Sequence, residues 1–500
     1  MLPPLIRRSR NIAPQRSRER GVTMALVALS MVAIIAMAGL SIDVGTLYEA
    51  STEAQRAADA AALAAARTIS MQGLTGDPTN VSSSWPQVCT LATQMAQAVA
   101  SQDTVGGIAP SSVTVTFSSG DQKSNCASTG AVSFGINPTV TVQVTQTNLP
   151  IFFARVFSLV SNNNYSNATV GATATAEVFN PSNWASYNGG SVIPVQPRCV
   201  KPWIVPNLDP NGGTSCTTGC PQFVNPSNGS LIRGGISVIP PGGVIGERFW
   251  LMPDCTNPAT GTACTPRNAA PEANYPNGGT GGTDPTAPVR PNLEYLPGQI
   301  PSTLTAVPAC ASSAPYAEAI AGCDQSTQYQ CGVQSSNTGP NFVDLSENPG
   351  LTDTTVGVQC LIHQSGTSTT LPNGQDVLLP TGTGLGALPP SYPFQIQAGT
   401  SSLLTSAAGD VITSSNSIAS LPIYDSSQGT TFTVGTTAPV TIVGFLQVFV
   451  NVVDGNGNMY VTVLNVSGCG NGLTTPVSTQ PVFGTSPVPV RLITPPPPSS

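Results

Sequence analysis

The hydrophobic pattern of the chain begins with a long apolar run. Residues 22–40 contain no charged residue, and Ser41 and Ile42 extend this run to Asp43. At a rise of 1.5 Å per residue, about 20 helical residues cross a hydrocarbon core of about 30 Å. A cleaved signal peptide would have a shorter apolar region, of about 7–15 residues, followed by a small-residue cleavage site. The pattern therefore predicts a retained transmembrane helix over residues 22–42.

The apolar run passes without a turn signal into an alanine-rich segment, residues 43–70. Because alanine is the best helix former, we expect one unbroken helix to leave the bilayer. A period of 3.6 residues places small and apolar residues in a narrow row along this helix. This small-residue stripe consists of Leu47, Ser51, Ala54, Ala58, Ala62, Ala65 and Ile69. Small side chains let another element approach closely, so the stripe predicts a helix-packing surface.

The small-residue stripe extends toward the membrane and has polar residues at its sides. Leu40 and Val44 continue it into the membrane. Gln55 and Asp59 flank it, where they could fix its register by hydrogen bonds. The charged residues expected to face water are Glu49, Glu53, Arg56 and Arg67. Two partners remain open for the stripe: a helix of another chain, or the next domain of the same chain.

Period-2 patterns follow the helix. A second helix is predicted over residues 85–101. At least three strands are predicted, because β-branched residues alternate with others in residues 111–117, 138–147 and 169–179. Together these elements indicate a small α+β domain over residues 71–180.

An apolar block, "LPIFFARVFSLV" at residues 149–160, interrupts these strands. One interpretation is a core helix beneath the sheet, which we favour because strands flank the block closely. The alternative places Phe152, Phe153 and Phe157 in the outer face of the membrane, with Arg155 at the lipid head groups.

The C-terminal half first loses and then regains its periodicity. Residues 181–315 are rich in Pro, Gly, Asn, Thr and Cys, so we expect short elements held by crosslinks. Residues 438–453 and 459–470 flank "DGNGN", which predicts a hairpin with a glycine-rich turn. The terminal "TPPPPSS" predicts an extended tail.

These patterns give an α+β fold class. A long transmembrane helix continues into an exported helix, followed by a small α+β domain and a β-rich, loop-rich C-terminal region. The predicted segments are a cytoplasmic basic segment (1–21), a transmembrane helix (22–42), an exported helix (43–70), an α+β domain (71–180), an irregular region (181–315), a β-rich domain (316–485) and a Pro-rich tail (486–500).

Charge is distributed unevenly. Residues 1–20 contain six arginines and one glutamate, a net charge of +5. Since the whole chain has a net charge of −7, residues 21–500 have a net charge of −12. A basic patch confined to the residues before a transmembrane helix is an orientation signal rather than a nucleic-acid site. We therefore expect a single-pass protein of the inner (cytoplasmic) membrane, with its N-terminus in the cytoplasm and its bulk periplasmic or extracellular.

Twelve cysteines fit an exported chain, in which an even count favours disulfides. Cys89 and Cys126 are the two cysteines of the 71–180 domain, so we expect them to pair; the alternative is two free buried thiols. Short spacings mark further disulfide candidates, namely Cys216 and Cys220, Cys255 and Cys264, and Cys323 and Cys331. A single histidine and one closely spaced cysteine pair argue against zinc.

The N-terminal residues carry a family resemblance. The stretch "ERGVTMALVALSMVAIIAMAGLSIDVGTLYEASTEAQRAADAAALAAA" resembles the N-terminal region of TadG-like proteins of Flp (Tad) pilus assembly, through Arg20-Gly21, "GLSIDVGTLY" and "QRAADAAALAAA". The stretch "LPIFFARVFSLVSNNNYSNATVGATATAEV" resembles the end of that family's first exported domain. The resemblance therefore covers about the first 180 residues.

The chain departs from two related patterns. Related pseudopilins have a glutamate five residues after the glycine of their peptidase site, whereas Leu26 stands there after Gly21. The sequence therefore does not predict processing at Gly21. Some members carry a von Willebrand A domain with a D-x-S-x-S metal motif, which this sequence lacks.

Enzyme motifs are largely absent from the sequence. It contains no H-E-x-x-H, Walker loop or G-x-S-x-G pattern. His363 is expected to be a partly exposed polar residue beside a strand. Asp454, Asn456 and Asn458 have the spacing of a calcium loop but lack its bidentate glutamate, which favours a plain turn. We expect no enzyme activity, cofactor, bound metal or small-molecule substrate.

The combined hypothesis is a non-enzymatic envelope protein of a Tad/Flp-type pilus assembly or secretion system, with other Tad components as partners of the N-terminal helix. A membrane-anchored surface adhesin that shares only the anchor module is the alternative, and an anchored hydrolase comes third.

Overall fold

A computed structural model of the chain describes residues 19–76, 84–118, 126, 138–154, 167–178, 195–197, 199–211, 221–227, 229–232, 243–254, 273–274, 291–300, 314–323, 329, 341–347, 351–369, 371–379, 392–403, 407–428, 432–469, 482–484 and 488–493. The chain divides into two compact units. The first comprises residues 1–58, 100–113 and 143–172, and the second comprises the remaining residues. The fold is α+β, as predicted.

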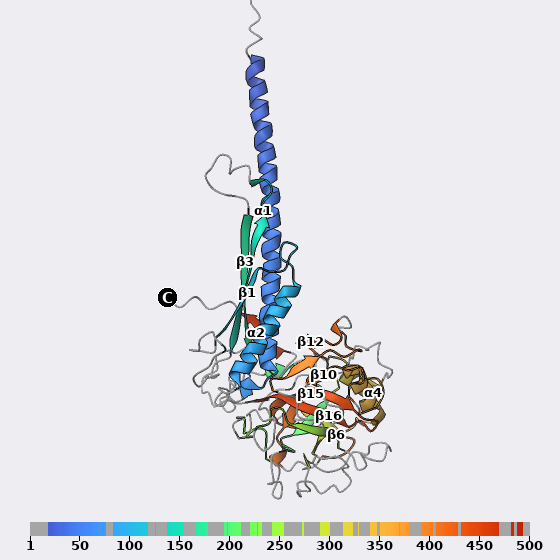
Figure 1. The fold of residues 1–500 in the computed structure, drawn as a ribbon. Helices are drawn as coiled ribbons and strands as arrows, with labels where there is room; N and C mark the ends of the chain where they lie inside the picture. Colours follow the sequence, from blue (N-terminus) through green and yellow to red (C-terminus); the bar gives the residue numbers. More distant parts are fainter. Residues whose placement is uncertain are drawn as a thin grey trace, which may run out of the picture. The chain divides into compact units, whose positions relative to one another are not determined.

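Helix α1 (Glu19–Ser70) is a single helix of 52 residues (Figure 1). It has the length and composition needed to cross a membrane. Within residues 22–42 every residue is exposed except Gly39. The predicted continuity of the apolar and alanine-rich segments is confirmed, since no turn interrupts the helix.

A four-stranded sheet follows, in the order β1 (Ser112–Ser118), β2 (Thr139–Pro150), β3 (Asn167–Val178) and β18 (Val490–Ile493). Helix α2 (Trp85–Gln102) precedes it, and the rings of Trp85 and Phe117 meet edge to face with centroids 5.5 Å apart. Burial alternates along β2, as expected for a strand with one covered face. The predicted second helix and three strands are confirmed.

The fourth strand of this sheet corrects a prediction. Residues 486–500 were expected to be a tail, but β18 pairs antiparallel with β3, with Val490 opposite Val178. An ion pair of 2.8 Å joins Arg491 to Glu177 across the two strands. The strand was missed because it has only four residues, too few to show a period-2 pattern, and because the residues around it are rich in proline.

The second unit contains a seven-stranded sheet in the order β5-β13-β15-β16-β6-β8-β7. An additional pairing of β5 with β8 closes this sheet on itself, and we name the part of the second unit built around it the closed-sheet domain. The strands of the sheet are β5 (Trp203–Pro206), β6 (Arg248–Pro253), β7 (Ala273–Asn274), β8 (Asn292–Pro297), β13 (Ile418–Tyr424), β15 (Ile442–Val453) and β16 (Met459–Gly468). The predicted hairpin is β15 and β16, with Val453 opposite Met459. All twelve residues of β15 are buried, so both faces of the strand are covered, and most of its residues are apolar.

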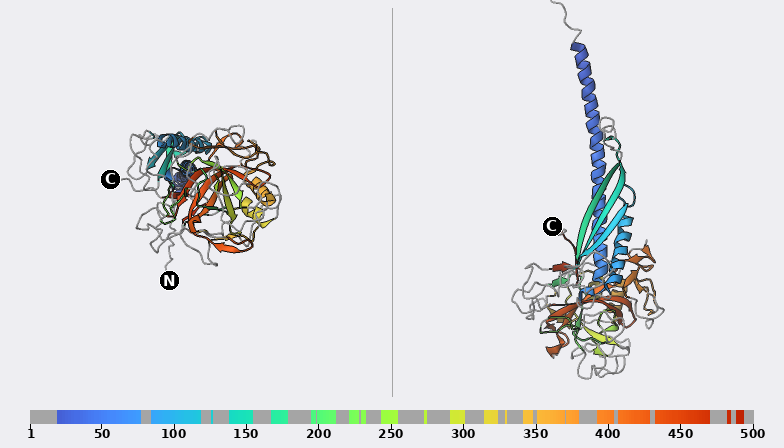
Figure 2. Two further views of the ribbon diagram at one scale, coloured as in Figure 1. Left: turned by 90° about the horizontal axis from the view of Figure 1, so that it is seen from below. Right: turned by 60° about the vertical axis from the view of Figure 1, so that its left-hand side comes forward.

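Strands β5, β6 and β8 come from the segment 181–315, which was predicted to be irregular and separate from a domain at 316–485. They pair instead with strands of the later segment in one closed sheet (Figures 1 and 2). In strands of four to six residues that are buried on both faces, apolar and polar residues do not alternate and the apolar run is short. Their pattern therefore does not distinguish them from loop.

Shorter elements complete the second unit. They are η1 (Leu74–Gly76), β4 (Val195–Pro197) with β17 (Val482–Gly484), β9 (Phe342–Asp344) with β14 (Thr437–Pro439), the sheet β10 (Val377–Leu379), β11 (Gln395–Gln397) and β12 (Val411–Ile412), α3 (Pro315–Ala321), α4 (Leu351–Ile362) and η5 (Ser426–Gln428). Helices α3 and α4 contact closely at Gly357, where a Cβ would lie 2.9 Å from the carbonyl oxygen of Ala317. The core of the closed sheet includes Trp203, Phe249, Tyr295, Leu421 and Phe449.

Candidate functional site

The buried face of α1 agrees with the small-residue stripe over its C-terminal half. Fully buried members of the stripe are Ala54, Ala58, Ala62, Ala65 and Ile69. Further alanines beside the stripe are buried as well, namely Ala50, Ala57, Ala61, Ala64 and Ala66. Since these positions are covered within a single chain, the structure favours intramolecular docking of the stripe over contact with another chain.

Nearer the membrane, the buried face differs from the predicted stripe. Leu40, Val44 and Ser51 are exposed, and Leu47 is half-buried. Each exposed residue lies one position after a buried one, and those buried residues are Gly39, Asp43 and Ala50. In this part of α1 the buried face therefore lies one residue before the predicted stripe, and it includes an aspartate that a row of small and apolar residues does not predict.

Asp43 is buried because its carboxylate accepts three backbone hydrogen bonds within the first unit. The N–H of Phe152 donates to Oδ1 at 3.0 Å, and the N–H groups of Phe153 and Ala154 donate to Oδ2 at 2.9 Å and 2.6 Å. Residues 151–154, which we name the exit turn, directly follow the end of β2. Asp43 is only 3% exposed. Consecutive N–H groups aimed at a carboxylate compensate the loss of its water.

These contacts also fix the charge of Asp43. Burial by itself raises the pKa of its carboxyl, but the hydrogen bonds from the N–H groups of Ala154, Phe152 and Phe153 lower it, and the pKa lies below its usual value. Asp43, which directly follows the apolar run 22–42, is therefore ionised at neutral pH.

Gly39 contacts the same turn. It lies one helical turn before Asp43, on the same face of α1. A Cβ on Gly39 would lie 2.8 Å from Cγ of Phe153, so only glycine lets the ring rest on the helix backbone. Gly39 and Asp43 thus form a two-point contact with residues 151–154.

The exit turn corrects the interpretation of residues 149–160 as a core helix. Phe152 is 61% exposed and Phe153 is 45% exposed, so neither side chain lies in a core. Residues 155–160, including Arg155 and Phe157, lie outside the described residues.

A second carboxylate of α1 acts similarly in the first unit. Glu53 was predicted to face water, but it is half-buried and its Oε2 accepts a hydrogen bond of 2.7 Å from the N–H of Gly106. Gly106 has a φ of +63°, a conformation that glycine adopts at little cost. Sequence reasoning missed both contacts, because a carboxylate's position on a helix does not reveal a distant backbone donor.

The residues after α1 belong to the core of the second unit. Nδ2 of Asn465 on β16 donates to the carbonyl oxygen of Ser70 at 2.6 Å. The Gln72 side chain exchanges two hydrogen bonds with the backbone of Phe394, and the hydroxyl of Tyr392 donates to the carbonyl oxygen of Gln72. Met71 belongs to the same apolar cluster as the closed sheet. No loop therefore separates the end of α1 from this domain.

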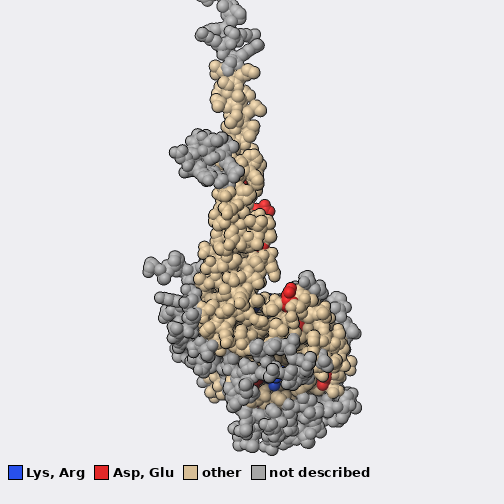
Figure 3. Space-filling view, in the orientation of Figure 1, with Lys and Arg blue, Asp and Glu red and all other residues tan. Residues whose placement is uncertain are grey.

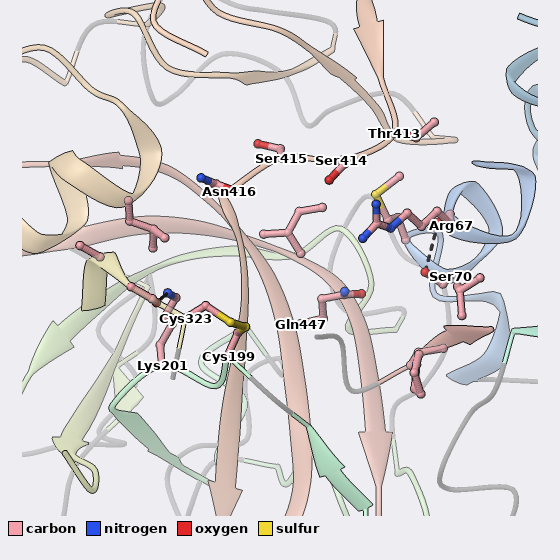
Figure 4. A pocket seen from close by; sticks show the side chains of 18 residues that line it. Arg67, Ser70, Cys199, Lys201, Cys323, Thr413, Ser414, Ser415, Asn416 and Gln447 are labelled. Atoms are coloured by element: carbon pink, nitrogen blue, oxygen red, sulfur yellow. Dashed lines mark hydrogen bonds between the residues drawn. A yellow bond between two sulfur atoms is a disulfide. The ribbon is translucent and has the colours of Figure 1, made fainter. Parts of the chain in front are cut away.

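A cavity of about 340 Å³ lies in the second unit beside Arg67 and Ser70 (Figure 4). Lys201 lines it, but its Nζ donates hydrogen bonds of 2.7 Å to the carbonyl oxygens of Ile320 and Gly322, at the end of α3. Burial lowers the pKa of Lys201 to about 7. Its ammonium group caps a helix end, as cations commonly do. The described lining contains no carboxylate or histidine that could act as a general base.

The other polar candidates have local roles. His363 is half-buried directly after α4, with a φ of 60°, and its Nε2 lies 3.4 Å from Nδ2 of Asn416. Oδ1 of Asp454 accepts hydrogen bonds from the N–H groups of Asn456 and Asn458, so this carboxylate closes the hairpin turn. Among the residues that the structure describes, no cluster of three His, Cys, Asp or Glu could hold a metal ion.

The structure joins Cys89 to Cys126, with Cα atoms 5.3 Å apart. It joins Cys323 to Cys199, with Cα atoms 4.3 Å apart, so Cys323 does not pair with its sequence neighbour Cys331. Cys360 and Cys469 are also disulfide-bonded. The candidates outside the described residues are Cys216, Cys220, Cys255, Cys264 and Cys331.

The two proposed register residues differ in environment. Gln55 is exposed and Asp59 is half-buried. Their role in fixing a register stays a prediction.

The segment that carries these contacts has known relatives. Residues 21–68 match the family described as "Putative Flp pilus-assembly TadE/G-like". This match confirms the resemblance over residues 21–68. The resemblance of residues 149–178 to the end of that family's first exported domain stays a prediction. The Tad segment includes Gly39, Asp43 and Glu53, and it ends just before the residues that enter the closed-sheet domain.

The match and the apolar helix together support a pilus-related envelope protein with a membrane-anchor helix. No curated protein and no solved structure matches the chain.

Proposed function

We propose that the chain is a non-enzymatic, single-pass protein of the inner membrane that serves a Tad/Flp-type pilus assembly or secretion system. The observation that carries the proposal is the coincidence of the Tad match, residues 21–68, with a continuous helix of 52 residues. Six arginines before residue 22 favour a cytoplasmic N-terminus, with residues 43–500 exported.

The proposed action is mechanical rather than chemical. Residues 22–42 hold the chain in the membrane, and residues 70–75 enter the core of the closed-sheet domain without a linker. Asp43 and Glu53 tie non-helical segments to α1 in the first unit. The chain thereby presents a β-rich domain on an anchor that is continuous with the domain's own fold.

The apolar surface of α1 within residues 22–42 makes the contacts with other Tad components. This surface is exposed along its length, for example at Leu26, Ile34 and Met37. In a bilayer such a surface faces lipid or another transmembrane helix. The stripe around Ala58 and Ala62 is covered within the chain and serves docking instead.

Reporter fusions after Ser500 test the topology. Alkaline phosphatase should be active there and green fluorescent protein should be dark. A bright fluorescent fusion together with inactive phosphatase would contradict an exported C-terminus.

Deletion of the gene tests the role in assembly. The deletion strain should lose its Flp pili. In a second strain, which keeps the gene but lacks the Tad secretion ATPase, the localisation of the protein should change. The alternative is a surface adhesin that shares only the anchor, and it is kept because the family match ends at residue 68. An adhesin predicts intact pili and lost surface attachment in the deletion strain.

A further inference from the structure

The exit turn exposes aromatic side chains where α1 leaves its apolar run. Residues 22–42 span about 31 Å at 1.5 Å per residue, which matches a hydrocarbon core of about 30 Å. Gly39 lies three residues before the end of this run. Since the Phe153 ring rests directly on Gly39, the ring lies at the depth of the last helical turn of the run.

The described segments around this turn are largely apolar. Within residues 36–48 and 149–154 the structure describes one charged side chain, Asp43, and its carboxylate is covered by three N–H groups. Exposed apolar and aromatic side chains in these segments are Met37, Leu40, Ile42, Val44, Tyr48, Phe152 and Phe153. Figure 3 shows few charged side chains on the described surface of the face it presents.

Water is a poor solvent for two exposed phenylalanines, whereas the boundary between head groups and acyl chains suits them. Tyr48 lies about 7.5 Å beyond Asp43 along the helix axis, at the level where tyrosines line a membrane interface. The buried carboxylate of Asp43 holds the turn in place without presenting a charge to lipid.

We infer that the exit turn is a membrane-contacting wedge whose partner is the lipid of the outer face of the bilayer, with Phe152 and Phe153 inserted beside α1. This inference rests on the proposed anchoring by residues 22–42. It adds a second, non-helical contact with the membrane, which would restrain rotation and tilt of α1.

Photocrosslinking of the full-length chain tests the wedge. The chain is reconstituted in vesicles of phosphatidylcholine and phosphatidylglycerol that contain radiolabelled phosphatidylcholine. The photoreactive benzoylphenylalanine replaces Phe152 in one variant. It replaces Ile34, in the middle of the span, in a second variant and Ile108 in a third. Ile108 is a matched control, because it is exposed to a similar degree in the same unit.

The expected result is a lipid adduct at positions 152 and 34, with position 108 at the level of the unirradiated sample. An adduct at 34 without one at 152, or a protein–protein adduct at 152 in place of lipid, would overturn the wedge and leave the anchor intact. Absence of lipid adducts at both 34 and 152 would overturn the anchor and the wedge together.

Discussion

Gln72 and Phe394 exchange two hydrogen bonds although 322 residues separate them in the sequence. Nε2 of Gln72 donates to the carbonyl oxygen of Phe394 at 2.8 Å, and the N–H of Phe394 donates to Oε1 of Gln72 at 2.6 Å. The side-chain amide of Gln72 thus donates one hydrogen bond to the backbone just before β11 and accepts one from it, as the backbone of a neighbouring strand would. The contact joins Gln72, two residues after the end of α1, to the closed-sheet domain.

Replacement of Gln72 by alanine should therefore destabilise the second unit. It leaves a buried N–H and a buried carbonyl without partners, at a cost of about 2–4 kcal/mol in the free energy of unfolding. Denaturant titration of the detergent-solubilised chain measures this. Gln97→Ala, on the exposed side of α2, is the matched control and should change stability by less than about 0.5 kcal/mol. Equal stability of the two variants would refute a structural role for Gln72.

Leucine at the buried stripe should overpack it. Ala58 and Ala62 are fully buried, so Ala58→Leu or Ala62→Leu should cost about 1–3 kcal/mol. Ser51→Leu, at an exposed stripe position, and Ala60→Leu, at a half-buried position, should be milder. Thermal unfolding compares the four variants, and a similar midpoint for all of them would show that the stripe is not tightly packed.

Gly39 and Gly45 offer a paired test of the exit turn. Gly39→Ala places a methyl group against Phe153, whereas a Cβ at Gly45 meets nothing within 4 Å. Both changes raise helix propensity by about 1 kcal/mol. Hydrogen-exchange protection of the amides of residues 152–154 should fall in Gly39→Ala and persist in Gly45→Ala. Unchanged protection in both variants would refute direct contact of the Phe153 ring with Gly39.

The Asp43 contact should depend on pH only in acid. The pKa of Asp43 is lower in the folded chain than its usual value of 3.8. Its stabilisation is therefore fully present above pH 3.8 and is lost as the pH falls through the lower folded value. Protection factors of the amides of residues 152–154, corrected for intrinsic exchange, should stay constant from pH 8 to pH 5 and fall below pH 3.8.

Asp43→Asn serves as the control for this titration. It lacks the charge, so its protection factors should be low and independent of pH over the same range. Loss of protection near pH 6 in the unmodified chain would show that another group controls the exit turn.

The Cys89–Cys126 disulfide should stabilise the small domain. It closes a loop with a sequence separation of 37, worth about 3–4 kcal/mol in the chain-entropy model. Cys89→Ala with Cys126→Ala should lower the free energy of unfolding by that amount. Mass mapping of the unmodified chain should find the crosslinked peptide pair. Either cysteine found unmodified, or joined to Cys199 or a later cysteine, would contradict the pairing.

The sequence alone determined the elements whose signals are local. Residues 22–70 form one helix because apolar length and alanine content act through neighbours within a few residues. The β15–β16 hairpin formed as predicted because a glycine-rich turn brings adjacent strands together. The Tad resemblance was likewise readable in the residues that the family match covers.

Only the tertiary structure decided features that depend on distant partners. Asp43 is buried because three backbone N–H groups from residues 152–154 surround it, and no helical period encodes a donor more than a hundred residues away. Strands β5, β6 and β8 are buried on both faces and β18 has only four residues, so no alternation marks them and only their pairing partners identify them as strands. Burial of a polar group or a short segment is favourable only once its partners are in place, so these features follow from long-range contacts rather than from local pattern.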